Sequence, residues 1–253
     1  MTERTAGHPT RVAVIGAKGR MGSLVCRTVQ AQPDLELAAR IDLGDDLAEL
    51  TGADVAVVFS VPEVAREHVL ACIERGVHAV VGTTGWTEES LDTVRRALVG
   101  APRLGVLVAP NFALGAVLMM RFATLAAPHF ESVEVIELHH PDKVDAPSGT
   151  ARRTAELVAA ARRDAGCPAI PDATATSLEG ARGAQVAGVR VHSVRLRGLV
   201  AHQEVLLGGP GEQLSLRHDS FDRASFMPGV LLGVREVAGH PGLTVGLEHY
   251  LGL

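Results

Sequence analysis

Lysine is nearly absent from this sequence. The chain has 253 residues, 24 of them Lys or Arg, yet only Lys18 and Lys143 are lysines. Arginine cannot replace an amine that must give up a proton or meet a phosphate as a compact charge, because guanidinium stays charged at any accessible pH. The two lysines that remain are therefore candidates for functional roles.

Aromatic residues and cysteines are also scarce. Aromatic side chains make up 3% of the chain and hydrophobic ones 47%, so the core has to consist of Val, Leu, Ile and Ala, as suits helices packed on a buried sheet. The cysteines form no Cys-x-x-Cys pair, which argues against a disulfide framework and a structural zinc site and fits a reducing cytoplasm. They are Cys26, Cys72 and Cys167.

The sequence has no long apolar run and no block of basic residues. No apolar run reaches the roughly 18 residues of a membrane-spanning helix, and the first ten residues are polar, without the apolar segment of an export signal. A formal net charge of −5, with no RNA-type aromatic motif, argues against a nucleic-acid partner. We expect a cytoplasmic protein that binds neither membranes nor nucleic acids.

The order of predicted elements divides the chain into two domains. Up to Phe112, strands alternate with helices, which predicts a Rossmann-like α/β domain with a parallel sheet. From Ala113 the pattern predicts an α+β domain with a mixed, largely antiparallel sheet. A last hydrophobic helix is predicted over roughly 222–238. Because this helix needs a face to cover, we assign residues 1–113 and 223–253 to a dinucleotide-binding domain and residues 114–222 to a substrate-binding domain. The elements predicted for the second domain are a helix over 115–127, a strand over 132–138, and successive antiparallel strands over 189–195, 199–207 and 213–219.

A glycine-rich turn follows the first predicted strand, residues 11–15, and precedes a helix over 23–31. Its pattern is Gly-x-x-Gly-x-x-Gly, close to the fingerprint in which glycines let the backbone approach a dinucleotide pyrophosphate at a helix N-terminus. Such turns also occur where a strand and a helix merely pack closely, so the turn alone is weak support. The cofactor contacts predicted here are Gly16, Ala17, Lys18, Gly19, Arg20 and Met21.

Asp42 strengthens the dinucleotide interpretation. It ends the second predicted strand, residues 35–41, and lies about 20 residues beyond the glycine turn, where an acidic residue holds the hydroxyls of the adenine ribose. Asp42 favours NADH, whereas Arg40 and Lys18 are suited to pair with the 2′-phosphate of NADPH. We therefore expect both cofactors to be used.

Small or polar residues also follow the later strands of the first domain. In an open parallel sheet, ligands bind beyond the carboxyl ends of the strands. Each run alone is more often an ordinary turn, but together the runs favour a cofactor crevice. The residues concerned are Gly82, Thr83 and Thr84 after the strand over 77–81, and Ala109, Pro110, Asn111 and Phe112 at the end of the strand over 104–109.

Residues 137–151 form the chemically richest segment. The alternation over 132–138 predicts a strand that ends near His139 and His140, and Pro141 then prevents a helix, so Lys143 lies in a loop. This turn allows an imidazole and an amine to reach the same cavity.

The same segment predicts an anion site. Ser148 is suited to cap a helix that covers 151–161, and the amides of Gly149 and Thr150 are then directed outward, an arrangement that binds anions. Together with the histidines and Lys143, it predicts acid–base chemistry on a small acidic molecule.

Other interpretations of the segment are weaker. Adjacent strand histidines point to opposite faces, so His139 and His140 do not easily share a metal, and no metal site is expected. Ser148 lacks the Gly-x-Ser-x-Gly elbow of a serine hydrolase. A solvated pair is the default for an isolated His-His dipeptide, but the nearby cation and anion site argue against it. Asp142 and Asp145 are interpreted as solvated loop carboxylates, with Asp145 able to orient Lys143.

The run from Glu137 to Ala151 resembles the signature E-x-H-H-x-x-K-x-D-A-P-S-G-T-A of the 4-hydroxy-tetrahydrodipicolinate reductase family, formerly called dihydrodipicolinate reductases. The runs over 16–22, 82–85 and 109–112 are similar to the cofactor segments of that family and follow in the same order. The resemblance covers nearly the whole chain, although Val58 stands where the family often has Asp.

This resemblance implies NAD(P)H-dependent reduction of 4-hydroxy-tetrahydrodipicolinate, a small dicarboxylate, in diaminopimelate and lysine biosynthesis. It also implies a homotetramer that assembles through the sheet of the second domain. Within the site, it implies that His139 donates and accepts protons, that Lys143 donates a proton, and that the substrate carboxylate is bound by His140, Gly149 and Thr150.

Two rival functions remain open at this point. One is a related two-domain dehydrogenase that acts on an amino acid, which has no need of His-His-x-x-Lys before Ser-Gly-Thr. The other is a nucleotide-sensing binding protein, which has no need of both His139 and Lys143. Fold alone excludes neither.

Overall fold

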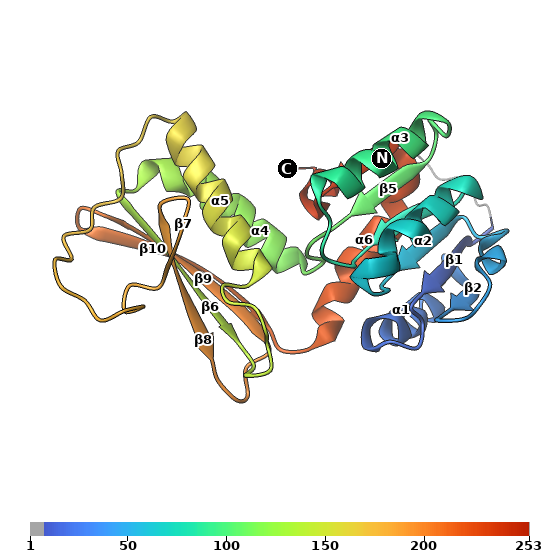
Figure 1. The fold of residues 1–253 in the computed structure, drawn as a ribbon, viewed down its shortest axis with the longest axis horizontal. Helices are drawn as coiled ribbons and strands as arrows, with labels where there is room; N and C mark the ends of the chain where they lie inside the picture. The colour runs from blue at the N-terminus through green and yellow to red at the C-terminus, as the bar shows by residue number, and fades with distance from the viewer. Residues whose placement is uncertain (1–7, 253) are drawn as a thin grey trace. The chain divides into compact units, whose positions relative to one another are not determined.

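The computed structural model describes residues 8–252, and the chain divides into two compact units (Figure 1). The first unit comprises the described residues up to Phe112 together with those from Phe226 onward, and the second comprises Ala113–Ser225. Residues 1–7, which belong to the polar stretch used above to argue against an export signal, lie outside the described residues.

The first unit contains a six-stranded parallel sheet with the strand order β11-β5-β4-β3-β1-β2. The order reverses at β1, which has β2 on one side and β3 on the other, and such a switch point is where open α/β sheets bind ligands. The strands are β1 Thr10–Ile15, β2 Leu35–Ile41, β3 Val55–Val58, β4 His78–Val81, β5 Gly105–Val108 and β11 Gly242–Val245.

Helices cover both faces of this sheet. On one face, α2 and α3 pack on alternate strand residues such as Ile15, Val58 and Val81. On the other, α6 approaches so closely that a Cβ on Gly233 would lie 3.0 Å from atoms of both Val80 and Leu107. The helices are α1 Arg20–Gln30, α2 Pro62–Glu74, α3 Glu88–Val99 and α6 Met227–Glu236, with short 3-10 turns η1 Leu47–Leu50, η4 Val237–Gly239 and η5 Leu247–Tyr250. A further 3-10 turn, η3 Arg223–Phe226, contains the last residues of the second unit and the first residue of the returning segment.

Two glycines let β1 pass directly into α1. Gly16 has φ of +83°, in the left-handed region that favours glycine, and a Cβ on it would lie 2.6 Å from the carbonyl oxygen of Phe59. A Cβ on Gly22 would lie 2.0 Å from the carbonyl oxygen of Gly16. The glycine turn is therefore required by close packing as well as by any role in ligand binding.

The second unit contains a five-stranded mixed sheet with the order β10-β9-β6-β8-β7. Only β6 and β8 pair in parallel, and the other three neighbouring pairs are antiparallel. One face is covered by α4 and α5, which pack on Val133, Val135 and Leu207. The elements are α4 Leu114–Ala126, η2 Ala127–His129, β6 Ser132–His139, α5 Gly149–Asp164, β7 Ala184–Val186, β8 Val189–Arg195, β9 Ala201–Gly209 and β10 Glu212–Ser220.

The predicted fold class is confirmed, with three differences in detail. The strands β8 and β9 follow each other in sequence but are not paired, because β6 lies between them. The prediction of three successive antiparallel strands is therefore right only for β9 and β10. The sequence analysis also did not predict β7 and β11, which have three and four residues and are too short for a clear periodicity. Within residues 8–252, no helix is long and apolar enough to cross a membrane.

The close approach of β1 and α1 can be tested with Gly22→Ala. The added methyl group would meet the Gly16 carbonyl, which is backbone and cannot swing away, so we expect a loss of about 1–3 kcal/mol in unfolding free energy. Urea unfolding followed by tryptophan fluorescence measures this, because the single tryptophan, Trp86, belongs to the first unit.

The control for this variant is Gly239→Ala, in the same unit. Apart from its chain neighbours, no heavy atom of residues 8–252 lies within 4 Å of a Cβ at Gly239, so this change should be neutral or stabilising by up to about 1 kcal/mol. Equal urea midpoints for the two variants would contradict the packing argument.

Candidate functional site

The carboxyl end of β6 carries the first part of the candidate site. Side chains alternate along the strand, and Val133 and Val135 are buried under the helices on one face. By the same alternation Glu137 and His139 lie on that face. Glu137 is 0% exposed, so its carboxylate is buried on the same face of the strand as the core valines.

Four N–H groups surround the carboxylate of Glu137. Its Oε2 lies 2.5 Å from Nδ1 of His139 and accepts from Nη1 of Arg195 at 2.8 Å. Its Oε1 accepts from Nη2 of Arg195 at 2.8 Å and from the amide of Ser148 at 3.2 Å. The carboxylate therefore joins the end of β6, the end of β8 and the start of α5.

These contacts determine the ionisation of Glu137. Burial acts to raise its pKa, but hydrogen bonds from His139, Arg195 and Ser193 outweigh burial and lower the pKa from 4.5 to about 2. The hydrogen bonds to Glu137 in turn raise the pKa of Arg195. A charged carboxylate and a charged guanidinium therefore meet beside the imidazole of His139.

Lys143 is linked to the same group of residues through Asp145. Its Nζ donates to Oδ1 of Asp145 at 2.7 Å, as the sequence analysis suggested, and the carbonyl oxygen of Asp145 accepts from Nη2 of Arg195 at 2.7 Å. Burial acts to raise the pKa of Asp145, but the hydrogen bond and charge of Lys143 lower it overall. Arg195 thus connects the strand that carries His139 to the loop that carries Lys143.

The start of α5 has the predicted cap. Ser148 is the N-cap residue, and its hydroxyl oxygen accepts from the amide of Ala151 at 3.2 Å. No heavy atom of the described residues lies within 4 Å of a Cβ placed on Gly149, so a ligand can approach the backbone there. Thr150 is half-buried in the same turn, and its carbonyl oxygen accepts from the hydroxyl of Thr154.

The second unit therefore brings together five of the residues predicted from the sequence. His139, Lys143, Gly149 and Thr150 are connected through Glu137 and its partners, and His140 is half-buried at the base of the loop, where its carbonyl oxygen accepts from the Lys143 amide at 3.3 Å. Among residues 8–252, no three His, Cys, Asp or Glu side chains are grouped as a metal site requires.

The first unit carries the predicted cofactor residues at the carboxyl edge of its sheet. Within the described chain, α1 has no side-chain cap at Gly19 and no acidic residue in its first turn. Its first amides are therefore suited to an anion such as a pyrophosphate. Lys18 and Arg20 are exposed beside this helix start, and Met21 is half-buried.

Asp42 is held against the glycine turn. Its carboxylate accepts from the amide of Lys18 at 2.6 Å and from the amide of Leu43 at 2.9 Å. These hydrogen bonds, the one from Lys18 above all, lower the pKa of Asp42. Arg40 donates to Oε1 of Gln30 at 3.0 Å. The arrangement places an ionised carboxylate beside the turn, as a ribose site needs.

Several other predicted cofactor residues have buried side chains, so they can present mainly backbone groups to a ligand. Ala17, Ala109 and Phe112 are buried, and Phe112 packs on Phe59 with ring centroids 5.9 Å apart. Thr83 is buried and donates its hydroxyl to the carbonyl oxygen of Ser60 at 3.0 Å. Of the remaining predicted contacts, the exposed ones are Thr84 and Pro110, and the half-buried ones are Gly16, Gly82 and Asn111.

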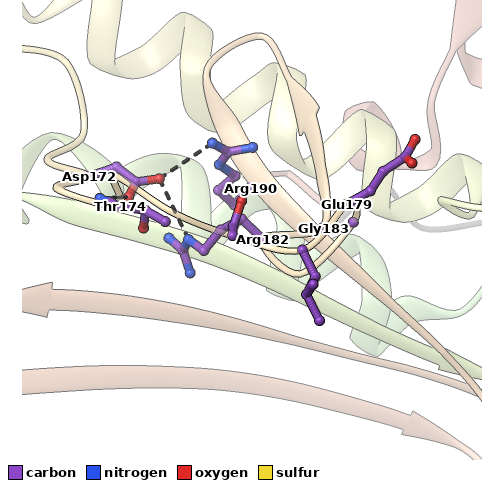
Figure 2. A pocket seen from close by; sticks show the side chains of 9 residues that line it. Asp172, Thr174, Glu179, Arg182, Gly183 and Arg190 are labelled. Carbon is purple, nitrogen blue, oxygen red and sulfur yellow. Dashed lines mark hydrogen bonds and ion pairs between the residues drawn. The ribbon is translucent and has the colours of Figure 1, made fainter.

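A pocket of about 400 Å³ opens elsewhere on the second unit (Figure 2). Figure 2 shows Asp172 facing both Arg182 and Arg190. Its Oδ2 lies 3.5 Å from Nε of Arg182 and 3.4 Å from Nη2 of Arg190. The charged side chains of this pocket form ion pairs with one another. Arg190 lies near the start of β8, whereas Arg195, the register partner of His139, lies at the other end of that strand. We therefore do not place the active site in this pocket. The lining residues are Asp172, Thr174, Ser177, Leu178, Glu179, Gly180, Arg182, Gly183 and Arg190.

The sequence analysis assigned no role to Glu137 or Arg195. A signal for Glu137 was present, since residues two apart on a strand share a face and Glu137 precedes His139 by two. Arg195 gave no local signal, because its place beside His139 follows from the parallel pairing of β6 and β8.

The buried carboxylate predicts a specific pH dependence of stability. The pKa of Glu137 is lowered from 4.5 to about 2, so its charge stabilises the fold above about pH 4.5, and this contribution is lost as the pH falls towards 2. Glu137→Gln removes the contribution. The stability gap between wild type and variant, measured by urea unfolding followed by circular dichroism, should narrow by up to roughly 3 kcal/mol between pH 5 and pH 2.

The control is Glu156→Gln, the same exchange at an exposed position of α5. Its stability should differ from that of the wild type by no more than about 0.5 kcal/mol at either pH. A Glu137→Gln gap that stays constant or widens towards acid would contradict the argument.

Comparison with known proteins identifies the family. Residues 10–112 match the family model described as dihydrodipicolinate reductase, N-terminus, and residues 115–251 match the one described as its C-terminus. The 4-hydroxy-tetrahydrodipicolinate reductase of Streptomyces coelicolor is 60% identical over 96% of this chain and 98% of that protein. The corresponding enzyme of Beutenbergia cavernae is 62% identical over 96% of this chain and 99% of its own length.

A solved structure supports the same family assignment. The dipicolinate-bound dihydrodipicolinate reductase from Paenisporosarcina sp. TG-14 matches with a TM-score of 0.84 and 39% identity, over 95% of this chain and 99% of that one. The two family models together span most of the sequence, and the relatives are matched over nearly their full length. The chain belongs to the dihydrodipicolinate reductase family.

Proposed function

We propose that this protein reduces 4-hydroxy-tetrahydrodipicolinate to tetrahydrodipicolinate, with loss of water, and that NADH or NADPH is the hydride donor. The observation that carries the proposal is the hydrogen-bonded group formed by His139, Glu137, Arg195, Asp145 and Lys143. It places two proton carriers next to a helix start that suits a carboxylate. The reaction belongs to diaminopimelate and lysine biosynthesis, the pathway of the family.

The substrate site in this proposal lies at the start of α5. The amides of Gly149 and Thr150 receive a carboxylate of the substrate at the positive end of the helix, and His140 contributes from the preceding loop. Gly149 supports this role because no described atom obstructs it. The solved relative that carries dipicolinate, an aromatic dicarboxylate, supports a small dicarboxylate as the substrate class.

The cofactor site in this proposal lies in the first unit. When bound, the nicotinamide supplies a hydride to the substrate. The uncapped start of α1 and the glycine turn 16–22 would hold the pyrophosphate, and Asp42 would hold the ribose hydroxyls. Further contacts would come from Gly82, Thr83 and Thr84 and from residues 109–112.

The chain's own residues manage the protons. Loss of water from the hydroxylated ring leaves a conjugated imine, and addition of a hydride then leaves an electron-rich enamine carbon that needs a proton. His139 donates this proton, and Lys143 stabilises charge or supplies a proton nearby. One substrate, one hydride and one proton thus give one tetrahydrodipicolinate and one water.

We also propose a cytoplasmic homotetramer that assembles through the sheet of the second unit. On the sheet face opposite α4 and α5, Ile136 and Leu206 are half-buried beside the ion pair of Glu134 and Arg182. Mixed apolar and paired charged residues suit an interface between copies. The free thiols of the chain are compatible with the reducing cytoplasm.

The proton-donor role can be tested with His139→Gln. We expect kcat to fall by about 10²–10⁴-fold, since general acid catalysis contributes that much, while cofactor affinity is kept. The assay follows the absorbance of NADH or NADPH in the presence of the freshly made condensation product of pyruvate and aspartate semialdehyde.

A matched exchange is available at His129, an exposed residue of η2. His129→Gln should leave kcat within about twofold of the wild type. Normal turnover in His139→Gln would remove the residue from the proposed role, and an inactive wild type would refute the proposed function itself.

Cofactor preference gives a further prediction. Asp42 accepts from the glycine turn and suits the ribose of NADH, whereas the exposed Lys18 suits the 2′-phosphate of NADPH. We expect the two values of kcat/KM to differ by less than about a hundredfold, or nearly 3 kcal/mol. Steady-state kinetics with both cofactors measures the ratio, and a larger one would show strict discrimination.

A further inference from the structure

We propose that Glu137 is a positioning residue that fixes the tautomer of His139, so that Nδ1 keeps its proton and Nε2 carries the proton that is transferred. The inference rests on the proposed function. It concerns a side chain that cannot touch the substrate itself, because Glu137 is 0% exposed. It acts on the reaction only through His139.

The tautomer follows from the donors around the carboxylate. Both guanidinium nitrogens of Arg195 and the amide of Ser148 donate to Glu137 and cannot accept. Beside these donors the carboxylate stays ionised and has no proton to offer. The 2.5 Å contact between Oε2 and Nδ1 of His139 therefore requires the proton to come from Nδ1.

This arrangement suits a repeated proton transfer. As an imidazolium, His139 donates from Nε2 while Nδ1–H remains bonded to Glu137, and the negative carboxylate stabilises the positive ring. After the transfer, the neutral ring already has the bare Nε2 that accepts the next proton. No rotation of the ring is needed between turnovers.

An isosteric amide at this position reverses the pattern. In Glu137→Gln, the amide oxygen has to stay at the Oε1 position, because the Ser148 amide and Nη2 of Arg195 both donate there and the backbone amide cannot turn away. The new NH₂ group then occupies the Oε2 position, where it faces Nδ1 of His139 and Nη1 of Arg195. This orientation opposes one fixed donor, whereas the reverse orientation opposes two. Nδ1 must accept, so the ring proton moves to Nε2.

The reversed tautomer cannot deliver a proton in the same way. A neutral ring that donates from Nε2 would become an imidazolate, and a second proton at Nδ1 would face the N–H of the glutamine. In serine proteases, the corresponding exchange of the orienting carboxylate for an amide selects the wrong tautomer and lowers kcat by about 10⁴-fold.

The test compares wild type and Glu137→Gln in two measurements. In turnover assays, we expect kcat to fall by at least about 100-fold, while KM and the Kd values for dipicolinate and NADH change by less than about threefold. In ¹⁵N spectra of the neutral His139 ring, assigned by their loss in His139→Gln, we expect Nδ1–H in the wild type and Nε2–H in the variant. A purely structural role would change binding and would not invert the tautomer.

The matched control is Glu156→Gln, the same exchange at an exposed position of α5. This variant should keep the His139 tautomer and a kcat within about threefold of the wild type.

Several results would overturn the proposal. They are Nε2–H in the neutral wild-type ring, retention of Nδ1–H in Glu137→Gln, or a kcat of that variant within about threefold of the wild type. If Glu137→Gln does not fold, the wild-type spectrum alone still decides the tautomer. An inactive wild type would refute the proposed reaction, whereas the spectra would still test the role of Glu137.

Discussion

The ionised carboxylate of Glu137 is the interaction on which the second unit and its candidate site both depend. A charge among buried valines is costly unless it is paired and fully hydrogen-bonded. Here four N–H groups from β6, β8 and the start of α5 meet it. The core is therefore stable only when these three segments are in place, and the same condition aligns His139.

Arg195 extends this constraint from the core to the loop. Its guanidinium binds Glu137 with two nitrogens and also donates to the carbonyl oxygen of Asp145, whose side chain holds Lys143. An arginine suits this position because its planar, permanently charged group makes several directed hydrogen bonds at once. An imidazole and an amine on different segments are thereby held by one cation.

In the first unit, backbone groups hold β1, the glycine turn and α1 in place. Gly16 and Gly22 allow β1 and α1 to approach closely, and Asp42 holds the turn through the amide of Lys18. In the part of the chain that the structure describes, the start of α1 has no side-chain cap, whereas α5 is capped by Ser148. Both helix starts suit anions. The first amides of α1 are left for a ligand, whereas the first turn of α5 is already ordered by the hydroxyl group of Ser148.

The sequence by itself determined what depends on neighbouring residues: the strand, turn and helix around the glycines, the loop of Lys143, and the cap at Ser148. Only the tertiary structure decided the environment of Glu137. Residues 132–138 have apolar side chains on both faces, so their alternation does not reveal that a carboxylate is buried. Arg195 lies 58 positions from Glu137, and sheet register alone makes them neighbours. Local preferences act over a few residues, whereas such pairs depend on how distant strands align.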